Sequence, residues 1–137
     1  MGESDNNIRV GVAYYPEHWD ESRWETDVDL MVDAGISVVR LAEFAWSRLE
    51  PSPGNFQFAW LERAIALFEC AGIKIVLGTP TAAPPAWLHE RYPDVYPADK
   101  RGYRLGFGTR LQRCLNHPAM RERSRAIVDA MAKHFAA

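Results

Sequence analysis

The sequence predicts an α/β fold built from parallel strand–helix units. The tripeptide Ala-Gly-Ile occurs at residues 34–36 and again at residues 71–73. Each copy follows an amphipathic helical pattern and precedes a short apolar run, Val38–Leu41 in the first case and Ile75–Gly78 in the second. Strands that alternate with helices form parallel sheets, because each helix crosses back over the sheet. Units of this kind either line up as an open sheet or close into a barrel.

Three strands are predicted, at residues 8–15, 37–41 and 74–78. A closed barrel of eight strand–helix units needs roughly 250 residues, whereas this chain has 137. We therefore expect the chain to be the first part of a larger domain. A compact three-stranded α/β domain is the alternative, although it would leave both sheet edges unpaired.

The first predicted helix lies between the first two strands. The first strand stops before Pro16, which cannot donate to a sheet ladder. Asp20 is a suitable N-cap for the helix, and Gly35 supplies a left-handed stop. The apolar positions with helical spacing are Trp24, Val28, Met31 and Val32. We expect this face to pack on the sheet.

The second strand leads into a long connection, residues 42–57, which contains Pro51, Pro53 and Gly54. Connections of this length are often functional. A second helix follows and ends at Gly72. Its predicted apolar stripe consists of Leu61, Ile65 and Phe68.

The part after the third strand is predicted to be a short helix, an excursion and a final helix. Pro85 can open the short helix, and residues 93–116 are rich in Gly, Pro and Arg with little periodicity. We expect these residues to form one excursion loop above the sheet. Pro118 then starts the last helix. Its apolar side holds Ile127, Val128, Met131 and Phe135.

Composition is that of an ordinary globular protein, with 47% apolar residues, 25% charged residues and a formal net charge of −2. Basic residues are scattered, so no nucleic-acid partner is expected. No apolar stretch approaches membrane-spanning length, which argues against a membrane partner. Residues 1–7 form a polar tail without a secretion-signal layout, and two cysteines are too few for a disulfide framework. These features predict a cytoplasmic protein.

Aromatic and polar residues follow the predicted strand ends. Tyr15 follows the first strand, Glu43 and Trp46 follow the second, and Thr79 follows the third. In parallel α/β folds the ligand site lies beyond the carboxyl ends of the strands. Flat rings beside carboxylates and hydroxyls suit a sugar, whose apolar face stacks while its hydroxyls need directional partners. This pattern favours carbohydrate binding.

Each of these residues also has a structural interpretation. Trp46 can equally serve packing, as buried tryptophans commonly do. Glu43 lies among apolar residues, where an unpaired carboxylate would be costly, so an ion pair with Arg40 or Arg48 competes with a ligand contact. The chain has no Gly-rich phosphate loop, no nucleophile elbow and no complete set of metal ligands at recognisable spacing.

Three segments taken together resemble one family. Residues 14–19 (YYPEHW), 40–47 (RLAEFAWS) and 77–88 (LGTPTAAPPAWL) are similar to the amino-terminal part of the β-galactosidases of glycoside hydrolase family 42. The resemblance implies an incomplete (β/α)₈ TIM barrel over residues 8–137, made of the first three βα units, the excursion loop and a following helix. It also implies further domains in the whole protein and a homotrimer.

The activity implied by the resemblance is hydrolysis of terminal β-D-galactosyl bonds with retention. Retention uses two carboxyl groups about 5 Å apart, one as acid/base and one as nucleophile. In the family the acid/base is a Glu that follows Asn at the fourth strand, and the nucleophile lies at the seventh strand. No Asn of this chain is followed by Glu. Both catalytic residues are therefore expected beyond residue 137, and this piece alone should be inactive. No cofactor is required.

Two residues map individually onto the family pattern. Arg110 matches an arginine that contacts the galactose, a task suited to a rigid guanidinium; the alternative is a salt bridge that closes the excursion loop. Cys114 matches a cysteine that in some members joins three later cysteines around structural zinc; the alternative is inert packing.

Two other functions remain open from the sequence. One is a related retaining glycosidase acting on another sugar, such as an arabinoside or a fucoside. The other is a short non-catalytic α/β protein that binds sugar or a partner through its rim and open edges.

Overall fold

The computed structural model describes residues 8–106, 108 and 112–136. These residues form two compact units. The first consists of residues 8–41 and 61–77, and the second of residues 42–60 and 78–136. The polar tail 1–7 and Arg110, both singled out by the sequence, lie outside the described residues.

The first unit contains a three-stranded parallel sheet. Its strands are β1 (Gly11–Ala13), β2 (Val38–Leu41) and β3 (Lys74–Leu77), in the order β1-β2-β3. Both neighbouring pairs are parallel, with Val12 beside Val39 and Val39 beside Ile75. The predicted α/β class, the parallel direction and the three strands are thus confirmed.

The first strand is shorter than the predicted range of residues 8–15. Only Gly11–Ala13 forms strand β1, while Ile8 and Val10 are exposed. Among the described residues β1 has a neighbour on one side only, so its amino-terminal part lacks a partner across the open edge.

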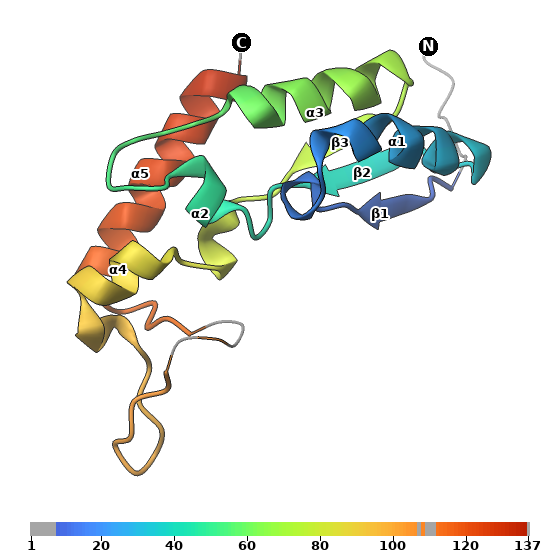
Figure 1. The fold of residues 1–137 in the computed structure, drawn as a ribbon. Helices are drawn as coiled ribbons and strands as arrows, with labels where there is room; N and C mark the ends of the chain where they lie inside the picture. Colours follow the sequence, from blue (N-terminus) through green and yellow to red (C-terminus); the bar gives the residue numbers. More distant parts are fainter. Residues whose placement is uncertain (1–7, 107, 109–111, 137) are drawn as a thin grey trace, which may run out of the picture. The chain divides into compact units, whose positions relative to one another are not determined.

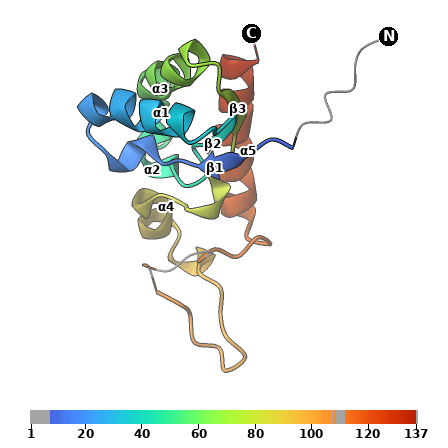
Figure 2. The same cartoon turned by 90° about the vertical axis from the view of Figure 1, so that its right-hand side faces the viewer.

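Helices α1 (Trp24–Asp33) and α3 (Ala59–Cys70) connect the strands and lie on one face of the sheet (Figures 1 and 2). Val39 and Leu41 point to this face and are fully buried. Arg40 alternates with them on β2 and is exposed, as is its neighbour Val76 on β3. Side chains of successive strand residues point to opposite faces, so one face of the sheet is covered and the other is open in the described part of the chain.

The repeated Ala-Gly-Ile tripeptide ends both helices by the same hydrogen bonds. Gly35 and Gly72 have φ of 73° and 72°. Ile36 N–H donates to Met31 O at 2.9 Å, and Ile73 N–H donates to Phe68 O at the same distance. These are Schellman-type ends, in which a left-handed glycine turns the chain away from the helix axis. The predicted stops are confirmed.

The start of α1 differs slightly from expectation. Asp20 caps a 3₁₀ turn, η2 (Glu21–Arg23), by accepting from Ser22 N–H at 2.9 Å, and η2 runs directly into α1. A preceding 3₁₀ turn, η1 (Pro16–His18), follows β1.

Val32 was predicted to face the sheet, but it is 48% exposed, whereas the charged Asp27 is buried. Hydrophobic spacing alone predicts neither position; Asp27 is buried with hydrogen bonds from Tyr14 and Arg23.

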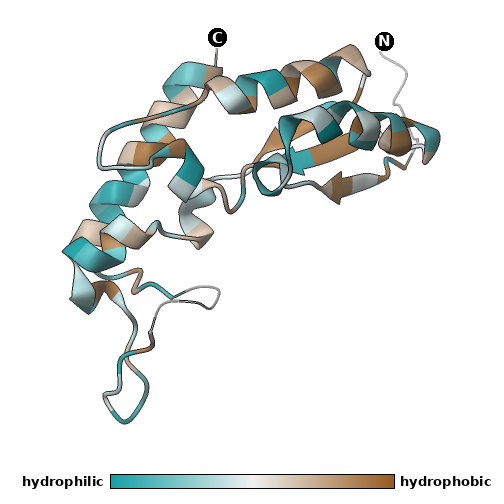
Figure 3. Ribbon diagram, viewed as in Figure 1, coloured by the Kyte–Doolittle hydropathy of each residue, from teal (hydrophilic) through white to brown (hydrophobic). Residues whose placement is uncertain are grey.

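The core of the first unit combines α1, α3 and β2. Trp24 is 2% exposed and its indole N–H donates to Pro16 O at 3.1 Å. Phe68 meets the Tyr14 ring edge-on, with the ring centres 5.6 Å apart. Val28 and Leu61 complete this core. In Figure 3 apolar and hydrophilic residues alternate along the ribbon of α3.

The second unit is helical. It contains α2 (Trp46–Leu49), η3 (Pro80–Ala82), α4 (Ala86–Arg91), η4 (Pro93–Val95) and α5 (Pro118–Phe135). Pro85 and Pro118 stand at the starts of α4 and α5, as predicted. The buried residues of α5 are Met120, Ile127 and Met131. Phe135 is half-buried and packs on Phe58, with the ring centres 5.5 Å apart.

The predicted excursion contains a small hairpin that extends from η4 (Figure 2). Ala98 and Arg104 form an antiparallel bridge. The Asp99 carboxylate accepts from the backbone N–H groups of Arg101 and Tyr103, at 2.8 and 3.0 Å. The Arg104 guanidinium donates to Asp94 O and Tyr96 O, at 2.7 and 2.9 Å. This loop has a defined internal structure despite its lack of sequence periodicity.

Candidate functional site

Three segments follow the carboxyl ends of the strands, and they hold the candidate site residues of the described chain. Because the strands are parallel, these ends share one edge of the sheet. The chain leaves that edge into residues 14–19 after β1, 42–46 after β2 and 78–85 after β3. The first segment belongs to the first unit and the other two to the second.

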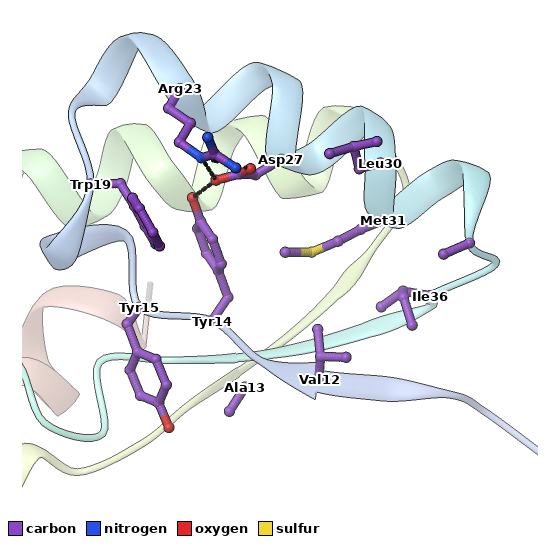
Figure 4. Close-up of a pocket in the computed structure, with 11 residues that line it drawn as sticks. Val12, Ala13, Tyr14, Tyr15, Trp19, Arg23, Asp27, Leu30, Met31 and Ile36 are labelled. Carbon is purple, nitrogen blue, oxygen red and sulfur yellow. Dashed lines mark hydrogen bonds and ion pairs between the residues drawn. The ribbon is translucent and has the colours of Figure 1, made fainter.

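After β1, two consecutive tyrosines point in opposite directions (Figure 4). Tyr14 turns toward α1 and is 8% exposed. Its hydroxyl donates to Asp27 at 2.8 Å, and Arg23 Nε donates to the same carboxylate at 3.1 Å. Tyr15 turns the other way, is half-buried, and stacks on His18 with ring centres 5.6 Å apart. The contacts of Tyr14 anchor the strand end from which Tyr15 is presented.

The pKa of Tyr14 is raised well above its usual value, first by burial and next by the hydrogen bond to Asp27. An unfolded tyrosine ionises near pH 10, whereas folded Tyr14 keeps its proton to higher pH. The raised pKa of Tyr14 therefore adds its full contribution to the free energy of unfolding below about pH 10, and this contribution is lost as the pH rises further. We expect the free energy of unfolding to fall above about pH 10, and to fall less steeply in Tyr14→Phe.

Urea unfolding at neutral pH and at pH values above 10 checks this expectation. Tyr103→Phe is the matched control, because Tyr103 is 71% exposed. If the free energy of unfolding falls equally steeply above pH 10 in Tyr14→Phe and in the unmodified chain, the expectation is wrong.

After β2, the backbone turns through a strained residue. Ala42 is fully buried and has φ of 69°, a conformation that costs an alanine about 1–2 kcal/mol. Gly78, which follows β3, approaches this turn closely: a Cβ built on Gly78 would lie 3.1 Å from Glu43 Cα. Strained backbone that the surroundings hold in place is frequent at functional sites. Ala42 and Gly78 together fix the position of Glu43, which is half-buried.

Trp46, another predicted contact residue, is fully buried in the second unit. Its indole N–H donates to the Glu50 carboxylate at 2.7 Å. Glu50 is itself fully buried and also accepts from Gly54 N–H at 2.7 Å. Trp87 N–H donates to Glu50 O at 2.8 Å. These bonds explain the burial of Trp46 by packing and by anchoring to Glu50. A contact between Trp46 and a ligand stays a prediction.

Glu50 and Asp27 are the important polar residues that the sequence analysis missed. Glu50 lies four residues after Trp46, a spacing that puts both side chains on one side of a helical turn. Asp27 lies four residues after Arg23 and forms an ion pair with it at 3.1 Å. Both could have been found from the spacing of an aromatic or basic donor and a carboxylate.

Cys114 lies in the second unit as a half-buried free cysteine. Its backbone N–H donates to Val95 O at 2.7 Å. Nearby in sequence, His117 Nε2 lies 3.1 Å from Asp94, and this hydrogen bond lowers the pKa of the Asp94 carboxyl. No group of three His, Cys, Asp or Glu side chains within the described ranges could hold a metal ion. A tetrahedral zinc site needs four ligands, so Cys114 does not make one with those residues.

Arg113, next to Cys114, donates through its guanidinium to Ala82 O at 3.3 Å. Burial lowers the pKa of this guanidinium. The bond ties the end of the excursion to η3, the turn that follows Thr79. Arg110 itself lies outside the described residues, so its role as a galactose contact stays a prediction.

Comparison with known proteins identifies the family. The sequence model of glycoside hydrolase family 42, described as β-galactosidase, matches residues 13–137. The chain belongs to glycoside hydrolase family 42. The β-galactosidase of Thermus sp. is 50% identical over 126 residues, which make up 92% of this chain and 20% of the relative. That of Haloferax lucentense is 46% identical over 129 residues, 94% of this chain and 20% of the relative.

Solved structures of β-galactosidases have a similar fold over these residues. The β-galactosidase from Halorubrum lacusprofundi superposes with a TM-score of 0.90 at 44% identity, covering 94% of this chain and 19% of that chain. The β-galactosidase from Bacillus circulans superposes with a TM-score of 0.90 at 32% identity, covering 94% of this chain and 19% of that chain. The chain thus spans about a fifth of the length of the relatives it matches. None of the helices described is long and apolar enough to cross a membrane.

Proposed function

We propose that these residues form the first three βα units of a (β/α)₈ barrel in a retaining β-galactosidase. The observation that carries the proposal is 50% identity over 92% of the chain to a protein named β-galactosidase. The parallel sheet, with helices on one face and an open second face, supports it, because a barrel places one face of its sheet inward. Residues 8–137 would be the amino-terminal portion of the catalytic domain.

The substrate in this proposal is a terminal, non-reducing β-D-galactoside. Tyr15, Glu43 and Arg110 would line part of the pocket, and Glu43 suits a sugar hydroxyl because a carboxylate accepts strong hydrogen bonds. The two catalytic carboxyl groups would come from beyond residue 137. One would protonate the leaving oxygen and the other would form the glycosyl-enzyme intermediate that water then releases.

We expect the 137-residue chain by itself not to hydrolyse galactosides. Loss of the proton donor and of the nucleophile each lowers the rate by orders of magnitude. Assay of the purified chain with a nitrophenyl β-D-galactoside should give no turnover above the blank without enzyme. Turnover by the chain alone would contradict the assignment of the catalytic residues.

A chimera tests whether these residues belong to a galactosidase. Residues 13–137 would replace the matching segment of the Thermus sp. β-galactosidase. We expect the chimera to hydrolyse nitrophenyl β-D-galactoside in preference to the corresponding arabinoside and fucoside. A folded chimera that prefers another sugar would favour a related glycosidase instead. A folded but inactive chimera would favour the non-catalytic binding protein.

Three further properties belong to the proposal for the whole protein. It would act in the cytoplasm, assemble as a homotrimer and need no cofactor for hydrolysis. Structural zinc at Cys114 would require three more ligands from outside the described residues.

A further inference from the structure

Tyr15 lies on the open face of the sheet in the first unit. Alternate residues of an extended chain point to the same side, so Tyr15 shares the face of Ala13, and Figure 4 shows its ring directed away from α1. Ala13 is aligned with Arg40 of β2, which is exposed on this face. In the barrel proposed above, this face points inward, and Tyr15 follows the strand end at which ligands bind. The Tyr15 ring is therefore suited to contact a bound sugar.

Two buried hydrogen bonds tie the segment around Tyr15 to helix α1. Before Tyr15, the Tyr14 hydroxyl donates to Asp27 at 2.8 Å. After Tyr15, the Pro16 carbonyl accepts from the Trp24 indole N–H at 3.1 Å. The backbone on either side of Tyr15 is thus attached to the same helix.

Asp27 reaches both ends of the segment 14–19 (Figure 4). It accepts directly from Tyr14 at the first end. It also accepts from Arg23 Nε at 3.1 Å, and the Arg23 guanidinium lies over the Trp19 ring, 5.0 Å from its centre, at the other end. One carboxylate therefore acts on the chain before and after the Tyr15 ring.

Packing alone does not require a carboxylate at this position. Asp27 is 8% exposed, and a buried carboxylate stabilises a fold no better than well-packed apolar residues of similar size. A hydrogen bond adds direction, because donor and acceptor must be aligned for it to form. The Tyr14–Asp27 bond therefore restricts the position of the strand end more narrowly than apolar contacts between the two residues would.

We propose that Asp27 is a positioning residue of the galactoside pocket, which fixes the Tyr15 ring through Tyr14 at one end of the segment and through Arg23 and Trp19 at the other. Asp27 does not touch the substrate, because it lies on α1 at the covered face of the sheet. The inference rests on the proposed function, since it takes the sugar as the ligand of Tyr15.

A double-mutant cycle separates positioning from a purely structural role. If Asp27 only stabilises the unit, its replacement changes kcat/KM by the same factor whether or not the Tyr15 ring is present. If Asp27 acts by holding that ring, its replacement has no further effect once the ring has been removed. Coupling of this kind is measured as the departure from additivity.

The cycle consists of Asp27→Asn, Tyr15→Ala and the double variant, each in the chimeric enzyme described above. Asn has a single acceptor oxygen, so it cannot replace both oxygens of the carboxylate. We expect each single variant to lower kcat/KM on nitrophenyl β-D-galactoside roughly tenfold, the scale of one aromatic contact. The double variant should lie within about twofold of Tyr15→Ala. Asp29→Asn is the matched control, because Asp29 is an exposed carboxylate on the same helix.

Tyr14→Phe provides a second, milder arm. It keeps the ring that packs edge-on against Phe68 and removes only the hydroxyl that donates to Asp27. It should show the same coupling to Tyr15→Ala, while circular dichroism and urea unfolding establish that each variant is folded.

Three results would overturn the positioning role while leaving the proposed function intact. They are additive losses in the cycle, full kcat/KM in Tyr15→Ala, and unchanged kcat/KM in folded Asp27→Asn and Tyr14→Phe. Failure of the proposed function itself is recognised separately, because the chimera without any of these substitutions would then hydrolyse no galactoside, and the positioning role would fall with it.

Discussion

Glu50→Ala is expected to lower the free energy of unfolding by about 3–5 kcal/mol. Glu50 is fully buried and its carboxylate accepts from Trp46 N–H and Gly54 N–H, each at 2.7 Å. The substitution leaves both donors without an acceptor in a site closed to bulk water. It also leaves a cavity, which adds to the cost when the surroundings do not collapse.

The loss of stability should depend on how many hydrogen bonds the side chain at position 50 can accept. Glu50→Gln keeps the size of the side chain but turns an amide N–H₂ toward one of the two donors, so we expect an intermediate loss of about 1–3 kcal/mol. Glu69→Ala is the matched control because Glu69 is exposed on α3, and it should change stability by no more than about 0.5 kcal/mol. Urea denaturation followed by circular dichroism measures all three. A loss in Glu50→Ala no larger than in Glu69→Ala would show that the network is not stabilising.

Gly78→Ala is expected to destabilise the chain by about 1–3 kcal/mol and to displace Glu43. The new Cβ would lie 3.1, 3.2 and 3.3 Å from the Cα, Cβ and N atoms of Glu43. Most of these are backbone atoms next to the strained Ala42, which cannot move aside as a flexible side chain could. The segment that presents Glu43 must therefore shift.

The control for Gly78→Ala is Gly106→Ala, because a Cβ on Gly106 would meet nothing within 4 Å. In the chimeric enzyme, Gly78→Ala should reduce kcat/KM on a nitrophenyl galactoside roughly 10²-fold, the scale associated with a displacement of about 1 Å in a catalytic pocket. Glu43→Gln should reduce kcat/KM as well, with little loss of stability. If Gly78→Ala loses stability but keeps full kcat/KM, Glu43 does not contact the substrate.

The organisation of the fold could be predicted well from local signals. Gly35 and Gly72 terminate helices in the same way because each needs only its own helix and a left-handed residue. Pro118 likewise begins α5 through local backbone restriction. The extent of β1 could not be read from its apolar run, because strand length depends on neighbours that the run does not contain.

The candidate site was predicted only in part. Tyr15 and Glu43 do follow strands that are parallel, as expected. Trp46 is a residue type that can stack on a sugar, yet its indole N–H donates to Glu50 inside the second unit. The close approach of Gly78 to Glu43 is not visible from residue type, since it arises from the three-dimensional course of the loops after β2 and β3.

The amino-acid sequence by itself determined the α/β class, the parallel strand order and the family, because periodicity, helix stops and long motifs are properties of contiguous residues. Only the tertiary structure decided which polar residues serve as anchors. Asp27 and Glu50 are buried because Tyr14, Arg23, Trp46 and Gly54 supply them with donors. Burial of a carboxylate depends on the partners that folding brings to it and on the packing that excludes water, and spacing along the chain indicates only which partners are possible.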